Sequence, residues 1–584
     1  MICQPEFRYP LNFRTLLEAF LAAPPAQPFV TTWNDDDQSN TTTFGEFWSR
    51  ARSHASYFRD HNVKAGDRII LIMPQGISLM AAFVGAMLLR AVPAILAYPN
   101  FKVEPAKYSF GLSGVSANLR ARLVVLDEAF PEDLLGHVSI GGSAELVRCP
   151  EIVELDPQLP TPRSEPGDLA FIQHSAGTTG LQKGVALSHA SVIRQLNHLA
   201  TALNIDGQDR IYSWLPLYHD MGLIACFLLP LFCHLPVVMQ SPTSWVMHPG
   251  TMLQLISEYR CTLCWVPNFA LQFLARRVPP EDRKTYDLSS LRVLINCSEP
   301  VRAQSMDEFF SRFASCGLQT NVLQSSYAMA ETVFAITQSE ISCSAGPRRI
   351  WVDAERFRND HLTAPVAPPA NGDREDATCF VSSGKCLPGS EVRIVSSTGE
   401  ELPEGAVGEI CIRSDSLFDG YYNRPDLTAT ALRDGSYRSG DLGFCREGEL
   451  YVVGRKNDLI IIAGKNVYPQ DVEEITCGHP AIHDGRAVAF GLFNPDLGTE
   501  EIVVVTEVEE EKYLEDSAVI ERALRNAIVA ELNVAVRAIY LKPPRWIVKS
   551  TAGKPARSTT REKLLAEHPE LVAKNSSLQA TSHE

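Results

Sequence analysis

A glycine- and threonine-rich segment carries the residue types that bind phosphate. The chain reads SAGTTG at 175–180, between two apolar, strand-like runs at 169–172 and 185–187. Glycines let the backbone approach a ligand closely, hydroxyl groups donate to phosphate oxygens, and a lysine neutralises negative charge. Residues of these kinds are Ser175, Gly177, Thr178, Thr179, Gly180 and Lys183. The pattern predicts a strand, a loop that binds a polyphosphate, and a second strand.

This loop differs from the Walker A loop of many nucleotide-binding proteins. The Walker pattern G-x-x-x-x-G-K-[ST] needs a glycine where Gln182 stands and a hydroxyl where Gly184 stands. A hairpin turn that binds nothing is the alternative interpretation. The loop by itself does not decide between the two, so the neighbouring segments must.

Polar segments follow two further strand-like runs. Residues 210–214 lead into LPLYHDMG at 215–222, where His219 stands beside Asp220. Open α/β sheets bind ligands at the carboxyl ends of their strands, which makes His219 a candidate catalytic residue. A lone histidine is more often structural, so that alternative stays open. Residues 291–295 run in the same way into NCSEP at 296–300.

A third strand-like run, 321–324, leads into SSYAMAET at 325–332. Here Tyr327 can stack on a base, and Glu331 can bind a divalent cation beside phosphates. The alternative is an ordinary helix start, where a glutamate suits the positive end of the helix dipole. Both interpretations stay open for this segment taken alone.

The elements that position these segments alternate between strand and helix. An amphipathic helix is predicted at 44–58, a strand at 68–73, a buried helix at 77–89 and another strand at 120–127. This order is typical of an α/β fold with a parallel sheet. Further helices are predicted at 190–203, 270–277, 305–313 and 518–532, and a further strand at 501–508.

Composition excludes several classes of protein. A chain of 584 residues that is 45% hydrophobic and 21% charged is globular and has room for several domains. Its net charge of −16 argues against nucleic acid as the main partner. Scattered cysteines and a start without a basic segment and apolar core predict a cytoplasmic protein. The apolar stretch 221–239 is interrupted by Pro230, His234 and Pro236, so no membrane span is expected.

Seven blocks occur in the order of a known superfamily. They are the phosphate loop, LPLYHDMGLI at 215–224, NCSEPVR at 296–302, SYAMAET at 326–332, YRSGDLGF at 437–444, GRKNDLIIIAGKNVYPQDVE at 454–473 and TAGK at 551–554. The chain resembles the adenylate-forming superfamily of acyl-CoA synthetases, peptide-synthetase adenylation domains and luciferases. It is more similar still to the fatty acyl-AMP ligases, over nearly its whole length.

The resemblance implies that Mg·ATP adenylates a carboxylic acid, here a fatty acid, and that pyrophosphate is released. The acyl group then passes to the phosphopantetheine thiol of an acyl carrier protein. In this scheme Glu331 holds Mg²⁺, Asp441 and Arg455 bind the ribose, and Lys554 and His219 are catalytic. The loop residues Thr178, Thr179, Gly180 and Lys183 would hold the β- and γ-phosphates. The other implied nucleotide-binding residues are Cys297, Ser298, Glu299, Pro300, Ser326, Tyr327, Ala328, Met329 and Thr332.

The resemblance also implies two domains. Residues 1–455 would form a large N-terminal domain of parallel-rich sheets with packed helices, and 456–584 a small mobile α+β domain, with a hinge at 454–458. Basic residues crowd the C-terminal end, and they form either a solvated face or a dock for an acidic carrier protein. They are Lys542, Arg545, Lys549, Lys554, Arg557, Arg561 and Lys563.

The acyl acceptor depends on the segment 331–384. It is longer than in CoA ligases and resembles the insertion that hinders CoA binding in fatty acyl-AMP ligases, although an ordinary variable loop is the alternative. The phrases YPQDVE at 468–473 and FVSSG at 380–384 also favour the ligases. An acyl-CoA synthetase is the nearest alternative, and a catalytically inactive nucleotide- or acyl-binding homologue is the other.

Several positions depart from the pattern of the superfamily. They are His174, Ala176, Gln182, Cys297, Ala328 and Asn457. None of these departures removes Glu331, Asp441 or Lys554. We therefore expect an active enzyme from an outlying subgroup, whose acid is not a long-chain fatty acid.

Overall fold

The first sheet of the large domain is parallel and covered by helices. Its elements are α2 (Phe44–Asp60), β3 (Arg68–Ile72), α3 (Ile77–Leu88), β4 (Val92–Ile95), α4 (Pro105–Leu119), β5 (Leu123–Asp127) and β6 (Glu145–Cys149). Thr43 begins α2 with a reciprocal capping box to Glu46. Gly85 lets α3 pack closely on α2, since a Cβ there would lie 2.7 Å from the Ala51 carbonyl oxygen. The elements predicted for this region are confirmed apart from their ends.

The computed structural model describes residues 9–34, 39–99, 105–150, 163–174, 183–341, 346–368, 376–462, 465–494, 497–549 and 555–573. Among them, a nine-stranded sheet has the order β17-β14-β13-β12-β11-β9-β10-β1-β2. Its strands are β1 (Pro28–Trp33), β2 (Ser39–Thr43), β9 (Ile211–Ser213), β10 (Val237–Met239), β11 (Leu263–Val266), β12 (Val293–Asn296), β13 (Leu323–Ala328), β14 (Ala335–Gln338) and β17 (Lys385–Cys386). The strands from β13 to β1 in this order run parallel, as predicted for an α/β fold.

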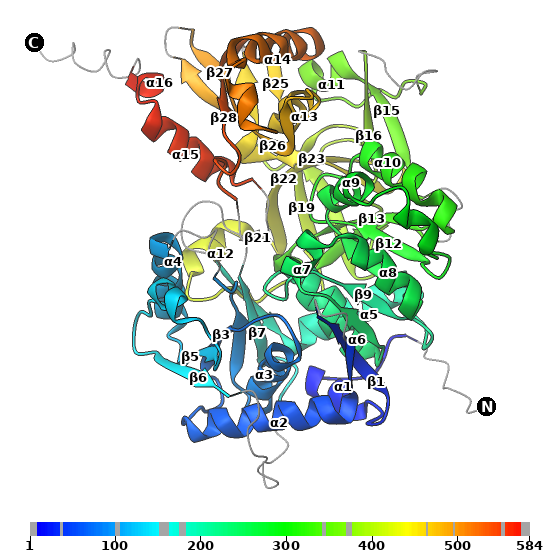
Figure 1. Cartoon of the computed structure of the whole chain (residues 1–584), viewed down its shortest axis with the longest axis vertical. Helices are drawn as coiled ribbons and strands as arrows, with labels where there is room; N and C mark the ends of the chain where they lie inside the picture. Colours follow the sequence, from blue (N-terminus) through cyan, green and yellow to red (C-terminus); the bar gives the residue numbers. More distant parts are fainter. Residues whose placement is uncertain are drawn as a thin grey trace, which may run out of the picture.

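Helices cover both faces of this sheet (Figure 1). They are α1 (Leu16–Ala22), α5 (His189–Ala202), α6 (Leu229–Cys233), α7 (Pro242–Met247), α8 (Gly250–Tyr259), α9 (Asn268–Arg277) and α10 (Ala303–Phe313). The apolar stretch 221–239 begins with two wholly buried helices, a π-helix, Met221–Leu228, and then α6. Among the described residues, the structure contains no helix that combines the length and apolar character needed to cross a membrane.

Other sheets of the large domain are antiparallel. The strands that flank the phosphate loop, β7 (Leu169–His174) and β8 (Gly184–Ser188), pair with each other, and β20 (Gly420–Tyr421) extends them. A five-stranded sheet comprises β18 (Ser390–Val395), β19 (Gly408–Ser414), β21 (Leu432–Arg433), β22 (Ser436–Arg446) and β23 (Glu449–Arg455). The remaining elements are β15 (Arg349–Asp353), α11 (Ala354–Asp360), β16 (Ala377–Val381) and α12 (Pro425–Ala431).

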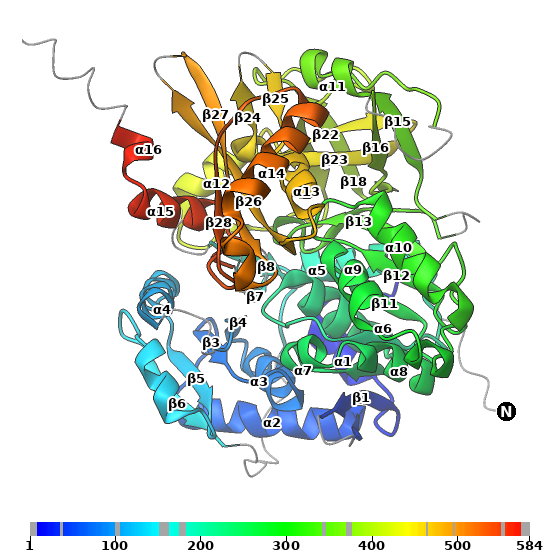
Figure 2. The same ribbon diagram turned by 45° about the horizontal axis from the view of Figure 1, so that its top comes forward.

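The C-terminal part of the chain has its own hydrophobic cores. Its elements are β24 (Ile460–Ile462), β25 (Lys465–Val467), α13 (Pro469–Cys477), β26 (Ile482–Asn494), β27 (Thr499–Val508), α14 (Ser517–Leu532), β28 (Val536–Lys542), α15 (Arg557–Glu567) and α16 (Glu570–Ala573). Helices α13 and α14 cover one face of the sheet β26-β27-β28, and α15 covers the other. Figure 2 shows this small domain, in orange and red, against the large one.

Gly384 provides a test of the packing between β14 and the turn after β16. Its φ is 93°, and a Cβ there would lie 2.0 Å from the carbonyl carbon of Gln338. We expect Gly384→Ala to lower the free energy of unfolding by about 2–4 kcal/mol, because a positive φ and a backbone clash act together. Urea unfolding followed by tryptophan fluorescence measures this loss.

Gly448→Ala is the matched control. Gly448 also has a positive φ, 75°, but no atom lies within 4 Å of a Cβ placed there. Only the backbone cost remains, about 1 kcal/mol. Equal losses in the two variants would contradict the clash at Gly384.

Candidate active site

Parallel strands bring three of the predicted segments to one edge of the nine-stranded sheet. Val266 at the end of β11 pairs with Asn296 at the end of β12, and Asn296 pairs with Ser325 on β13. The amide of Asn296 donates to Asn268 Oδ1 at 2.8 Å, and the backbone N–H of Arg302 donates to the same oxygen at 3.1 Å. These bonds anchor both ends of the segment 297–301 on Asn268, which follows β11.

The segment Cys297 to Pro300 forms a tight turn. Ser298 has a φ of 67°, in the left-handed region that a non-glycine residue rarely adopts. Its hydroxyl lies 3.9 Å from the sulfur of Met221, and the carboxylate of Glu299 accepts from the backbone N–H of Phe269 at 3.0 Å. The turn therefore lies between the residues that follow β9 and those that follow β11, with Cys297, Ser298, Glu299 and Pro300 at the sheet edge.

His219 follows β9 and precedes the π-helix. Its Nδ1 lies 2.7 Å from Asp220 Oδ1, which also accepts from the backbone N–H of Met221 at 2.8 Å. Gly222 is required here, because a Cβ would lie 2.3 Å from the carbonyl oxygen of Pro216. The His219 side chain is 21% exposed, so it is held by its neighbour but open to a ligand. π-Helical segments are frequent at functional sites.

Tyr327 and Asp441 meet across two sheets. The Tyr327 hydroxyl donates to Asp441 Oδ2 at 2.6 Å, and Arg455 Nε lies 3.6 Å from Asp441 Oδ1. Burial raises the pKa of the Asp441 carboxyl, and Arg455 and Tyr327 offset that effect only in part. The Arg455 side chain is 70% exposed, so water screens its attraction. Two hydrogen-bond acceptors are thus held beside a buried aromatic ring.

Glu331 lies in a single 3-10 turn, Ala330–Thr332, after β13 has continued through Ala328. The helix-start interpretation of this segment was wrong, because β14 pairs with β13 and keeps it extended. The turn uses its own polar groups. Ser326 and Thr332 donate to the carbonyls of Thr337 and Phe334, and the Phe334 carbonyl also accepts from the Met329 N–H.

Glu331 and Lys183 converge on Tyr421. The Tyr421 hydroxyl donates to Glu331 Oε1 at 2.7 Å, and Lys183 Nζ lies 4.9 Å from the centre of the Tyr421 ring. Sequence reasoning missed Tyr421, because nothing in its local pattern distinguishes it from a core aromatic. It reaches the site only because β20 pairs with β8.

Part of the predicted site lies outside the described residues. These positions are Ser175, Gly177, Thr178, Thr179, Gly180 and Lys554. His174, the last residue of β7, is buried, and burial lowers the pKa of its imidazole to about 4. A neutral His174 brings no charge to the phosphate loop, whereas Lys183, at the other end of the loop, is exposed and positive.

Salt bridges assign the residues around the predicted hinge to one side or the other. On the large domain, Arg455 pairs with Asp441, and Lys456 Nζ lies 3.0 Å from Glu409. On the small domain, Asp458 forms a salt bridge with Arg557. Asn457 is the residue between these two sets of contacts.

Arg557 is neither part of a solvated basic face nor available to dock a carrier protein. Its guanidinium donates to Glu473 at 2.8 Å and to Asp458, and its side chain is only 20% exposed. Lys542 is also compensated, by Glu567 at 2.7 Å. Fewer cations of the predicted cluster are therefore free to bind an acidic partner than the sequence indicates.

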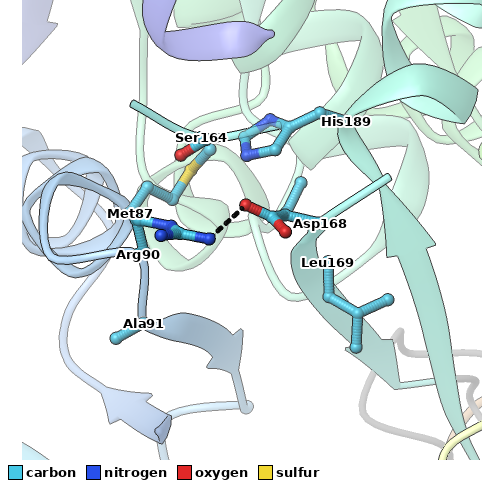
Figure 3. A pocket seen from close by; sticks show the side chains of 8 residues that line it. Met87, Arg90, Ala91, Ser164, Asp168, Leu169 and His189 are labelled. Carbon is cyan, nitrogen blue, oxygen red and sulfur yellow. Dashed lines mark hydrogen bonds and ion pairs between the residues drawn. The ribbon is translucent and has the colours of Figure 1, made fainter. Parts of the chain in front are cut away.

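A small cavity near the start of β7 lies away from this site (Figure 3). Arg90 and Asp168 form a 2.9 Å salt bridge at its wall, with His189 nearby. The cavity adjoins the first residue of β7, whereas the phosphate loop follows the last, about 20 Å along the strand. It is not the nucleotide site.

Known proteins match this chain along most of its length. The family model described as AMP-binding enzyme matches residues 17–422. A medium-chain-fatty-acid–[acyl-carrier-protein] ligase of Moorena producens is 30% identical and covers 96% of both chains. A long-chain-fatty-acid–AMP ligase of Mycobacterium marinum is 29% identical over 90% of this chain and 91% of its own. A structure solved in a study of fatty acyl-adenylate ligases from E. coli and L. pneumophila has a TM-score of 0.87 at 28% identity, covering 97% of this chain and 100% of its own.

The raised pKa of Asp441 predicts how the stability of the fold depends on pH. A carboxyl whose pKa is higher in the folded state contributes stability at low pH that is lost as the pH rises through that pKa. Asp441→Asn removes this loss, so we expect its Tm relative to the wild type to increase between about pH 4 and about pH 8. Thermal unfolding across that range measures the difference.

Asp426→Asn is the control with the opposite sign. Hydrogen bonds from Arg424 lower the pKa of Asp426 to about 2, so this carboxylate stabilises the fold at neutral pH and less as the pH falls. The Tm of Asp426→Asn relative to the wild type should decrease as the pH rises from about 2 to about 4 and change little above that, so this control is measured down to about pH 2. The same trend in both variants would show that burial does not dominate at Asp441.

Proposed function

Because the chain belongs to the AMP-binding enzyme family, we propose that it adenylates a fatty or related carboxylic acid with ATP and transfers the acyl group to a carrier protein. The acceptor thiol would be the phosphopantetheine of an acyl carrier protein. One observation carries the proposal: Lys183 and Glu331, from separate segments, meet on Tyr421. A cation and a carboxylate are thereby placed together, as polyphosphate with a divalent cation requires.

The described residues suit the binding of Mg·ATP. Tyr327 offers a ring for the adenine, and Asp441 offers acceptors for the two ribose hydroxyls, while Arg455 borders it. Glu331 Oε1 accepts from Tyr421, which leaves Oε2 for a hard cation. Mg²⁺ needs few protein ligands when phosphate and water complete its shell, and no group of three or more potential metal ligands occurs among the described residues. Bound there, Mg²⁺ would neutralise phosphate charge.

The chemistry joins two anions. The substrate carboxylate attacks the α-phosphorus in line, a new P–O bond forms, and the α–β bridging bond breaks to release pyrophosphate. Lys183 would hold the leaving phosphates, and Lys554 would bridge the carboxylate and α-phosphate. Positive charge and positioning supply most of the rate in such a step. In the second step the thiol adds to the acyl carbonyl, loses its proton and displaces AMP.

An aromatic wall beside the turn 297–300 suits an apolar acyl chain. Trp214 follows β9 and stacks on Trp245, with ring centres 3.7 Å apart. Phe269, whose N–H bonds to Glu299, contacts both indoles edge-on. Since β9 and β11 end here, the wall lies next to His219 and the turn 297–300. We therefore assign the acyl chain to this wall.

We divide the chain into a large domain, 1–455, and a small domain, 456–584, that moves about Asn457. Arg455 and Lys456 form salt bridges to the large domain and Asp458 forms one within the small domain, so Lys456, the first residue after the boundary, still contacts the large domain. A hinge needs only a few residues that absorb a change of backbone angles. Asn457 would absorb the rotation that exchanges Lys554 for the acceptor thiol.

The segment 331–384 supports a carrier protein as acceptor. Within it, Arg349 makes two hydrogen bonds to Asp307 of the large domain, at 2.7 and 2.6 Å. Phe357 stacks on Tyr468 of the small domain with ring centres 5.5 Å apart, and His361 bonds to Asn466. An insertion that is packed on both domains restricts the space between them, where CoA would have to enter.

A reducing, cytoplasmic compartment fits the cysteines. Those among the described residues are free thiols, and most of them are buried. Burial raises the pKa of Cys261 to about 12 and that of Cys264 well above its ordinary value, so neither is a reactive thiolate. Cys261 and Cys264 are therefore buried structural residues where the chain enters β11, and not a redox pair.

Lys554→Ala tests the first half-reaction. We expect ATP/pyrophosphate exchange with a panel of short, medium, long and aromatic acids to fall by about a hundredfold or more, because one charge between two anions is lost. Lys512→Ala is the control, since Lys512 lies on the same domain but is exposed and paired with Glu510. No exchange with any acid in the wild type would favour an inactive binding homologue.

An endpoint assay tests the acceptor. Purified protein is given Mg·ATP, a labelled acid, and either CoA or a phosphopantetheinylated carrier protein. We expect acyl-AMP to accumulate in the presence of CoA and to be consumed when the carrier is added. Formation of acyl-CoA would instead identify an acyl-CoA synthetase, and the insertion would be an ordinary long loop.

A further inference from the structure

One face of the small domain combines basic side chains with aromatic rings. We call it the basic face. Its members, from the segment after β28 and from α15, are Lys542, Arg545, Trp546, Lys549, Arg561 and Lys563. α15 lies at the outer edge of the small domain in both overall views (Figures 1 and 2).

Trp546 holds two of the lysines in place. The Nζ of Lys563 lies 4.3 Å from the centre of the Trp546 ring and donates to the Trp546 backbone carbonyl at 2.7 Å. The Nζ of Lys542 lies 4.8 Å from the same ring, and Glu567 accepts from the indole N–H at 3.0 Å. Cation–π contact and hydrogen bonds thus order side chains that are otherwise mobile. Ordered side chains lose less entropy when a partner binds.

Most of the charge on this face is uncompensated. Glu567 pairs with Lys542 and also attracts Lys563, but within the described residues no carboxylate lies within salt-bridge distance of Arg545, Lys549 or Arg561. Arg545, Lys549 and Arg561 are exposed, and Arg561 lies over the ring of Phe490. These three exposed cations form a local basic patch on a chain of net charge −16, and such a patch attracts an acidic partner.

The basic face borders the segment that contains Lys554. Lys549 pairs with Pro555 in a β-bridge, and the N–H of Ala556 donates to the Val548 carbonyl at 2.8 Å. These contacts join the two ends of the segment 550–554. A partner bound to the basic face is therefore held on the rotating domain, next in sequence to the segment that contains Lys554.

We propose that the basic face is the docking surface for an acidic helix of the acyl carrier protein. This inference rests on the proposed function and specifies where its acceptor binds. The carrier protein is favoured over free CoA because the cations are spread along a helix and the segment beside it, whereas the phosphate groups of CoA need a compact cluster. Arg557 takes no part, since Asp458 and Glu473 occupy its guanidinium. Charged surfaces of this kind govern association more than chemistry.

The test is a double charge reversal, Arg545→Glu with Arg561→Glu. Neither residue is part of the nucleotide site, so acyl-AMP formation, measured by ATP/pyrophosphate exchange, should remain unchanged. The KM for a purified phosphopantetheinylated acyl carrier protein of net negative charge should rise about tenfold or more, with kcat little altered. The rise of this KM with NaCl should be steeper for the wild type than for the variant.

Arg522→Glu is the matched control. Arg522 is exposed on α14, which covers the opposite face of the same sheet, so the charge change per site and the domain are the same. It should leave the KM for the carrier within about twofold, because its charge is remote from the docked partner. Free pantetheine is the second control, since it offers the thiol without the protein, and its KM should not change.

The outcomes are distinct. An unchanged carrier KM in the double variant, or an equal rise in Arg522→Glu, would overturn the docking surface and leave the proposed function standing. A rise with pantetheine or CoA equal to that with the carrier would also overturn it, because the face would then act on the thiol arm. A wild-type enzyme that forms acyl-AMP but never acylates the carrier would overturn the proposed acceptor and the docking surface together.

Discussion

The parallel strands of the nine-stranded sheet constrain everything else in the site. β9, β11, β12 and β13 end at one edge, so residues far apart in the chain meet there: His219, the turn at 297–300 and the 3-10 turn with Glu331. Strand ends in a parallel sheet leave backbone groups and polar side chains without a ladder partner. The same edge is therefore available to a ligand, and the paired strands of the sheet hold its residues in place.

Burial of charge is the cost of this arrangement. The Asp441 carboxyl lies where solvation is poor, and Tyr327 and Arg455 only partly compensate, so its pKa stays raised. Enzymes commonly keep such unfavourable groups where a substrate will satisfy them. Two ribose hydroxyls would give Asp441 the hydrogen bonds that the protein does not. The strained φ of Ser298 belongs to the same edge and is maintained by the bonds that anchor its turn.

The two domains are joined by few residues but many charges. Arg455, Lys456 and Asp458 are consecutive or nearly so, yet they form salt bridges on opposite domains, which leaves Asn457 as the hinge of the proposed rotation. Phe357 and Tyr468 add an aromatic contact between the insertion and the small domain. Partly exposed salt bridges are individually weak, so they can hold one arrangement without preventing rotation to another.

The sequence by itself determined the α/β class and the order of most strands and helices, because periodicity, glycine positions and strand ends are local signals. It also predicted the segments that we propose to carry the chemistry. It did not reveal Tyr421, because β20 joins β8 only through tertiary pairing. It left open whether a helix begins at Glu331, and it counted Arg557 among the surface cations. Only the tertiary structure decided these points, since burial and ion pairing depend on which distant residues come into contact.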